Sequence, residues 1–216
     1  NALTDNTWNG IVVSGDSTKT HTWRNARNIA YIVTSDVRVA DVTLTIQPGT
    51  VIKFGVERQG VVGALTIYNG GNLVAKGTAD APIVFTSVSD DRLIDSNPLQ
   101  GAGDPAAGDW RGIKVDVTAN TEPNRVTELS NVEIHYAGAG DNPALLIESP
   151  NTQVNALKIT NGGGPGVRVN KANTSISDST IDGMDGHCIV FDTDNAIEPA
   201  LQRNTLAHCV AAVVID

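Results

Sequence analysis

Four side chains in the C-terminal half have the chemistry of a binding or cleavage site: Glu133, His135, Lys158 and Asp182. An imidazole or an amine can act as a base, and a carboxylate can act as an acid or pair with a cation. The first and last of them lie 49 residues apart, so they can act together only if the fold brings them to one place. The elements that carry them therefore decide whether a site exists.

The segments around these residues belong to an internal repeat. A six-residue phrase with apolar first and last residues occurs four times, at intervals of 25, 22 and 25 residues. A second apolar phrase follows each copy, at intervals of 22, 22 and 24 residues. The first phrases span 129–134, 154–159, 176–181 and 201–206, and the second span 145–147, 167–169, 189–191 and 213–215.

The phrases alternate apolar and polar residues, which is the pattern of a strand with one buried face. Gly, Asn, Asp and Pro fill the intervals, as in 161–165 and 182–186, and leave no room for a helix. Short strands, sharp turns and a period of 22–25 residues predict the coils of a parallel β-helix, an all-β solenoid. A β-sandwich is the alternative, but its hairpins give no reason for a common period.

The N-terminal half contains similar strand phrases, beginning at 44–46 and ending at 113–115. It reads LTIQPGTVIKFG, later LTIYNGGNLVAKGTADAPIVFTSVSDD, and then GDWRGIKV. This sequence resembles the opening of right-handed parallel β-helix modules in large bacterial exported proteins, which belong to the pectin-lyase-like superfamily. The resemblance covers about residues 31–116 by motif and 129–216 by coil pattern, and it implies a right-handed coil. Because the superfamily holds lyases, hydrolases, adhesins and passive stalks, it implies no single activity.

The two ends suggest a domain division and a kind of partner. Residues 8–13 (WNGIVV) echo 110–115 (WRGIKV), so we expect residues 1–30 to finish or cap a coil and 31–216 to form the β-helix domain. No polar cap follows the last phrase at 213–215. A terminal coil exposes unpaired backbone, so we expect neighbouring coils or subunits stacked end to end, as in a fragment of a longer array.

Equivalent residues of successive coils stack about 4.8 Å apart, so the aligned phrases predict which side chains share a face. The predicted ligand-binding residues are Glu133, His135, Lys158 and Asp182. Cleavage of a polysaccharide would instead use His135, Lys158, Arg168 and Asp182. A solvated face of mixed charge is the alternative interpretation. The two outward columns are Glu133, Lys158, Thr180 and Thr205, and His135, Thr160, Asp182 and Ala207.

The resemblance implies two enzymatic alternatives. Some pectin-cleaving hydrolases carry paired aspartates and a Gly-His-Gly turn, and the similar segment here holds Asp182, Asp185 and His187. Their Asn-Thr-Asp phrase is absent, Cys188 replaces the second glycine of the His turn, and no Arg-Ile-Lys follows. The lyases need carboxylates for Ca²⁺ beside a basic residue, for which Arg168 is the candidate.

A long connection between Phe85 and Trp110 is rich in carboxylates and holds three glycines. Ca²⁺ takes six to eight oxygen ligands, so such a loop can bind it. No EF-hand spacing is present, and a surface loop without metal is the alternative; no other cofactor is expected. The predicted metal ligands are Asp90, Asp91, Asp104 and Asp109, and Asp95 lies in the same connection.

The pairs His187–Cys188 and His208–Cys209 are separated by 21 residues, close to one coil. The coil alignment places Cys188 opposite Ala212 and Cys209 opposite Met184, which is out of register for a zinc site. We expect buried, unpaired cysteines, with a disulfide as the alternative in an oxidising compartment.

Composition narrows the function. The 216-residue chain has a net charge of −9 and no cluster of Lys or Arg, which argues against nucleic-acid binding, and no apolar run long enough for a membrane helix. We therefore expect an extracellular or cell-surface module of a bacterial protein, non-enzymatic, with a structural, adhesive or polysaccharide-contacting role. The alternative is a polysaccharide lyase or glycoside hydrolase acting on an acidic polysaccharide.

Overall fold

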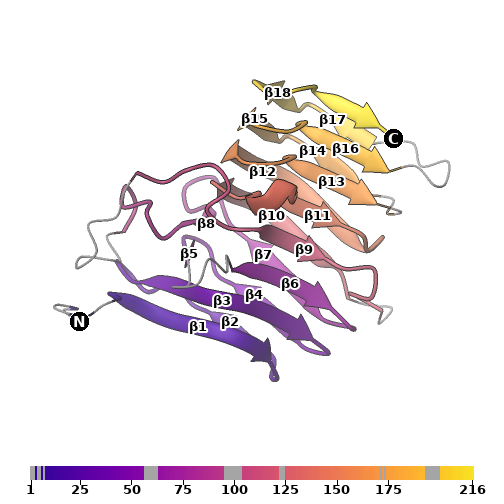
Figure 1. The fold of residues 1–216 in the computed structure, drawn as a ribbon. Coiled ribbons are helices and arrows are strands. Elements are labelled where there is room, and N and C mark those ends of the chain that lie inside the picture. The colour runs from indigo at the N-terminus through magenta and orange to yellow at the C-terminus, as the bar shows by residue number, and fades with distance from the viewer. Residues whose placement is uncertain are drawn as a thin grey trace.

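The computed structural model describes residues 3, 6, 8–55, 63–94, 104–121, 125–170, 172, 174–192 and 200–216. The chain winds as a right-handed parallel β-helix whose first and last coils lie at opposite ends of the stack (Figure 1). Every pairing between its strands is parallel, and the strands join into one continuous sheet. This confirms the predicted fold class and excludes the β-sandwich, which is built from antiparallel hairpins.

Each complete coil contributes backbone to three faces. Face 1 contains β2 (His21–Trp23), β4 (Thr43–Ile46), β7 (Asn72–Lys76), β14 (Ser175–Ser177) and β17 (Ala200–Gln202). Face 2 contains β5 (Val51–Phe54), β8 (Ile83–Ser87), β15 (Thr180–Met184) and β18 (Thr205–Ala207). Face 3 contains β6 (Ala64–Tyr68), β9 (Gly112–Val115), β11 (Leu145–Ile147), β13 (Val167–Asn170), β16 (Ile189–Asp192) and β19 (Val213–Ile215).

Four longer strands bend at a corner and serve two faces. The strands β10 (Thr127–His135) and β12 (Thr152–Gly162) run through faces 1 and 2. The strands β1 (Gly10–Ser17) and β3 (Ala30–Ala40) run through faces 2 and 3. One short 3₁₀ helix, η1 (Ala139–Asp141), precedes β11. In the described part of the chain, no helix is long and apolar enough to cross a membrane.

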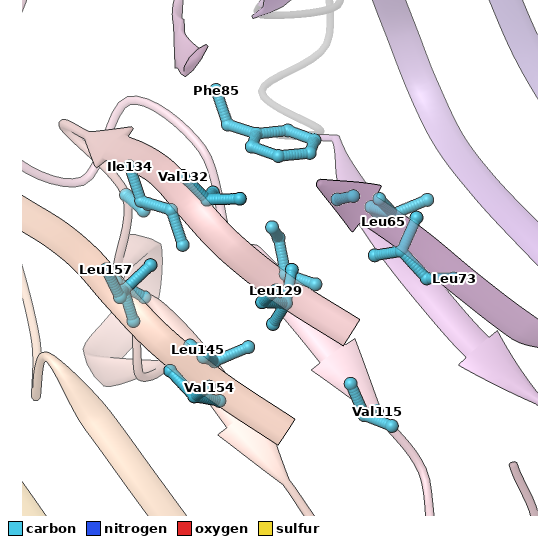
Figure 2. Close-up of a cluster of buried hydrophobic side chains, with 14 of the residues drawn as sticks. Leu65, Leu73, Phe85, Val115, Leu129, Val132, Ile134, Leu145, Val154 and Leu157 are labelled. Carbon is cyan, nitrogen blue, oxygen red and sulfur yellow. The ribbon is translucent and has the colours of Figure 1, made fainter. Parts of the chain in front are cut away.

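The predicted coil register is confirmed residue by residue. Leu129 pairs with Val154, Val154 with Ile176, and Ile176 with Leu201, so the four repeat copies form one inward stack. Inward side chains from all three faces fill the space between them, as Figure 2 shows for the middle coils. Burial of these stacked apolar columns is the main force that holds the coils together.

Corners between the faces use left-handed backbone, which explains the turn residues of the sequence. One column of corner residues, between faces 1 and 2, has φ between 48° and 54°. A second column, between faces 2 and 3, has φ between 49° and 69°. Asn, Asp and Gly adopt this conformation at low cost. The first column is Asn131, Ala156, Asp178 and Arg203, and the second is Tyr136, Asn161, Gly183 and His208.

The N-terminal residues belong to the same stack. Strand β1 pairs in parallel with β3, and β2 pairs in parallel with β4. Residues 10–23 therefore continue the coil pattern toward the N-terminal end, whereas a domain boundary at residue 30 stays a prediction.

Candidate functional site: a charged groove on face 2

The connection after β8 folds back over face 2. Its first part, which we call the 88–94 segment, lies over Lys53 of β5 and Thr86 of β8, two outward side chains that are fully buried. The Lys53 ammonium donates to the Asp91 carboxylate at 3.3 Å and to the carbonyl of Ile94. The Thr86 hydroxyl donates to Asp90 Oδ2 at 2.7 Å. Two polar side chains of the strands thus hold the segment on the face.

Arg92 is fixed at the edge of this segment. Its guanidinium donates to both oxygens of the buried Asp90, at 2.7 and 2.9 Å, and lies 5.5 Å from the centre of the Tyr136 ring. Burial raises the pKa of Asp90, but the hydrogen bonds from Arg92 and Thr86 outweigh it and hold that pKa below the usual value of 3.8. The pair is therefore a charged pair at neutral pH.

Beyond this segment face 2 is open, and a groove of about 370 Å³ runs across three coils. All four predicted ligand-binding residues line it, on neighbouring strands β10, β12 and β15. The registers place Lys158 opposite Glu133, and Thr160 between His135 and Asp182. The complete lining is Arg92, Leu93, Glu133, His135, Lys158, Thr160, Asn161 and Asp182.

The strand side of the groove carries a hydrogen-bond network around His135. Glu133 Oε2 lies 3.3 Å from Lys158 Nζ and 3.0 Å from His135 Nε2. The other ring nitrogen, Nδ1, lies 2.7 Å from Thr160 Oγ1. Burial lowers the pKa of His135 below its usual value of 6.5 and outweighs the opposing effect of the Glu133 carboxylate. The imidazole is therefore neutral at pH 7.

Neutrality fixes the tautomer of this ring. A carboxylate can only accept a hydrogen bond, so His135 Nε2 carries the proton and donates to Glu133. Nδ1 then accepts from the Thr160 hydroxyl. Both nitrogens are occupied by protein partners, and a general base needs a lone pair within reach of the substrate proton. The arrangement favours a rigid binding surface over a proton acceptor.

Asp182 is also paired, with a residue that the repeat pattern did not indicate. His208 Nδ1, on the next coil, lies 2.6 Å from Asp182 Oδ1, and its side chain is 82% exposed. Nominal strand spacings put the backbones of Asp182 and Glu133 roughly 12 Å apart, two coils and two residues away. The two carboxylates therefore sit at opposite ends of the groove.

Arg168 does not lie with the other predicted catalytic residues. It projects from β13 on face 3, where its Nε is 3.9 Å from Asp192 Oδ2. The second phrase of each repeat forms a separate face, so the two phrases do not share a surface. Asp185 and His187 are likewise absent from the lining of the groove.

The predicted calcium ligands do not gather into a metal site. Asp90 binds Arg92, Asp91 binds Lys53, and Asp109 Oδ2 accepts from Ser87 at 2.6 Å. Among the residues that the structure describes, no three or more His, Cys, Asp or Glu side chains are placed to hold a metal ion. Asp95 lies outside the described residues. The carboxylates of Asp90, Asp91 and Asp109 hold the connection on β5 and β8, and no calcium chemistry is derived from them.

The expectation of unpaired cysteines was wrong, because Cys188 and Cys209 form a disulfide with Cα atoms 5.4 Å apart. They are out of register along the strands, as expected, since the backbone pairing sets Cys188 opposite Ala212. The tight corner between faces 2 and 3 nevertheless brings both sulfurs to its inner side. Aligning the residues of successive coils cannot predict a bond that forms across a corner.

Sequence reasoning missed three lining residues of the groove, Arg92, Leu93 and Asn161, and the pairing of His208 with Asp182. Arg92 and Leu93 come from an insertion with no counterpart in other coils, so the repeat gave no position for them. His208 is a corner residue with φ of 49°, and its pairing with Asp182 depends on that backbone conformation.

A three-faced coil with stacked inward columns places this chain in the class of parallel β-helix proteins. The family model described as the pectate-lyase like beta helix domain matches residues 15–145, which is more than half of the chain, and the chain belongs to this family. This confirms the resemblance drawn from the sequence. No curated protein and no solved structure gives a significant match.

Proposed function

We propose that this chain is a secreted or cell-surface β-helix module whose face 2 groove binds an extended polysaccharide without cleaving it. The observation that carries the proposal is the groove itself. On three successive coils about 4.8 Å apart, it presents a carboxylate and an imidazole from β10, an ammonium and a hydroxyl from β12 and a carboxylate from β15, beside a fixed guanidinium. A linear polymer with hydroxyls and carboxylates at regular intervals matches such a ladder.

Three further observations support this assignment. The Cys188–Cys209 disulfide is the kind of bond that persists outside the reducing cytosol. The net charge of −9 suits an extracellular module that stays soluble. The occupied nitrogens of His135 favour binding over turnover.

Cleavage of an acidic polysaccharide is the second candidate. The observation that favours it is the presence of cations, Arg92 and Lys158, beside a neutral imidazole in one groove. Binding a substrate that displaces the Thr160 hydroxyl would free His135 Nδ1 as a base.

A glycan array followed by calorimetric titration tests the proposal. Lys158→Ala should weaken binding about tenfold, since a hydrogen bond to a charged group contributes about 1.5–3 kcal/mol. Lys114→Ala is the matched control, because Lys114 is likewise an outward lysine in a salt bridge, with Asp116 and Glu148, but lies on face 3. Equal losses in both variants, or no glycan bound by the wild type, would refute the groove as the binding site.

Turnover is measured on the same glycans, by unsaturated product for a lyase and by reducing ends for a hydrolase. The binding proposal expects no turnover. Robust cleavage that His135→Ala abolishes would replace it with the enzymatic candidate.

A further inference from the structure

The lining of the face 2 groove carries as many carboxylates as cations. Its cations are Arg92 and Lys158. Its carboxylates are Glu133 and Asp182. The imidazole of His135 adds no charge at pH 7, because burial lowers its pKa below the usual 6.5. The spacing of these groups suits ligand hydroxyls and ligand carboxylates alike, so the charges decide which of the two the groove accepts.

Both cations are already neutralised within the protein. The Arg92 guanidinium donates to both oxygens of Asp90, a fully buried carboxylate, at 2.7 and 2.9 Å. Lys158 Nζ lies 3.3 Å from Glu133 Oε2. A ligand carboxylate that approached either cation would also approach the carboxylate bound to it, so attraction and repulsion would largely cancel. With Asp90 included, the carboxylates at the groove outnumber the cations.

Several groups in the groove can only accept a hydrogen bond from a ligand. Glu133 and Asp182 are carboxylates, and the side chain of Asp182 is 45% exposed although it pairs with His208. The Thr160 hydroxyl spends its proton on His135 Nδ1, so its remaining lone pairs are acceptors. A ligand hydroxyl can donate to each of these acceptors, whereas a ligand carboxylate has no proton to give and would be repelled by the first two.

The uncharged part of the lining also suits a sugar without charge. Leu93 is 49% exposed and offers an apolar surface to the C–H face of a sugar ring. The Asn161 amide both donates and accepts hydrogen bonds, as a hydroxyl does. The protein as a whole carries a net charge of −9, which repels a polyanion before it reaches the groove.

We infer that the ligand of this groove is a neutral polysaccharide, rich in hydroxyls and free of carboxylate and sulfate groups. The inference rests on the proposed function and narrows it to one class of polymer. Arg92 and Lys158 then serve as hydrogen-bond donors to ligand hydroxyls, and their own carboxylate partners hold them in position.

Binding to chemically matched ligands tests the inference. The glycan array carries neutral polysaccharides, polyuronates, and the carboxyl-reduced form of each polyuronate, which keeps the linkages and length but has no charge. The bound ligands should be neutral, and by calorimetry each reduced form that binds should bind at least about tenfold more tightly than its parent polyuronate. The affinity for a neutral ligand should change less than about twofold between about 50 and about 500 mM NaCl.

The possible failures of this test are distinguishable. A polyuronate that binds more tightly than its reduced form, with an affinity that falls as salt is added, would overturn the inference while leaving the groove a polysaccharide-binding site. An array on which nothing binds would refute the proposed function and the inference together.

A gain of binding gives a second readout. The double variant Glu133→Gln, Asp182→Asn keeps the shape of both side chains and an oxygen acceptor in each, but it leaves the groove cations in excess. It should bind polyuronates about tenfold more tightly than the wild type does. The control Asp116→Asn, Glu148→Gln removes the same charge from face 3 and should not gain. Equal polyuronate affinities in two double variants with wild-type circular dichroism would overturn the inference.

Discussion

His135 shows how a polar residue is accommodated on the outer face of a solenoid. The preceding residues of its outward column, Lys53 and Thr86, lie under the 88–94 segment, and His135 stands at the edge of that cover. Burial lowers the pKa of its imidazole, and Thr160 and Glu133 satisfy both ring nitrogens. The ring is therefore part of the packed structure as well as of the groove.

This lowered pKa makes the stability of the protein depend on pH. The unfolded chain takes up a proton near pH 6.5, before the folded chain does, so the free energy of unfolding should fall as the pH drops below about 6.5. Urea titrations between about pH 7.5 and about pH 5 measure this free energy of unfolding. His135→Gln should lose this dependence, whereas the exposed control His208→Gln should keep it. Identical pH profiles for the wild type and His135→Gln would contradict the assignment.

Lys53 makes two of the contacts that hold the 88–94 segment on face 2. Lys53→Met keeps the length of the side chain but removes the donor to Asp91 and the Ile94 carbonyl, and should cost about 2 kcal/mol of unfolding free energy. Limited proteolysis should then cut within 88–94 first. Lys158→Met, on the same face but half exposed, is the control and should change stability by less than about 1 kcal/mol. Equal losses of stability in the two variants would show that Lys53 does not hold the 88–94 segment in place.

At the scale of the element, the corners set the shape of each coil. All four residues at the corner between faces 1 and 2 have positive φ, yet only two are Asn or Asp. Ala156 has φ of 49°, a conformation that costs an L-residue with a Cβ about 1–2 kcal/mol. The coil tolerates this cost because flanking strand pairs fix the backbone.

Relief of that strain should stabilise the protein. Ala156→Asn, which matches Asn131 of the preceding coil, is expected to raise the free energy of unfolding by about 1 kcal/mol in urea denaturation. Ala156→Val at the same site should be less stable than the wild type, because β-branched residues are poorest in this region. A Val variant as stable as the Asn variant would show that φ at this corner is not the cause.

The elements also show what the sequence could and could not predict. The common face of the outward residues on β10, β12 and β15 could be predicted because alternating strands of similar coil length have only one register that buries Leu129, Val154 and Ile176. Arg168 was grouped with them because spacing along the chain does not say how many faces a coil has. The Cys188–Cys209 bond and Arg92 escaped prediction because corners and insertions follow no period.

At the scale of the whole molecule, each coil contacts only its neighbours, so stability is local. The Cys188–Cys209 disulfide ties the coil of residues 200–216 to the coil before it. Closure of a loop of 21 residues contributes about 3 kcal/mol in the chain-entropy account.

Reduction should therefore open the C-terminal coil without unfolding the rest. In the double variant Cys188→Ser, Cys209→Ser, amide exchange over residues 200–216 is expected to speed up about a hundredfold, the equivalent of about 3 kcal/mol, while β10 and β12 keep their protection. Hydrogen-exchange mass spectrometry resolves the two regions. Equal loss of protection in both would show that the stack unfolds as one unit.

The 88–94 segment limits the positions at which a polymer could bind along face 2. A regular solenoid offers a repetitive ligand many equivalent positions, each shifted by one coil, and so cannot distinguish one alignment from the next. By sealing the outward residues Lys53 and Thr86, the insertion removes that translational equivalence. The groove therefore starts at one fixed position, His135, and a bound polymer would be aligned relative to that position.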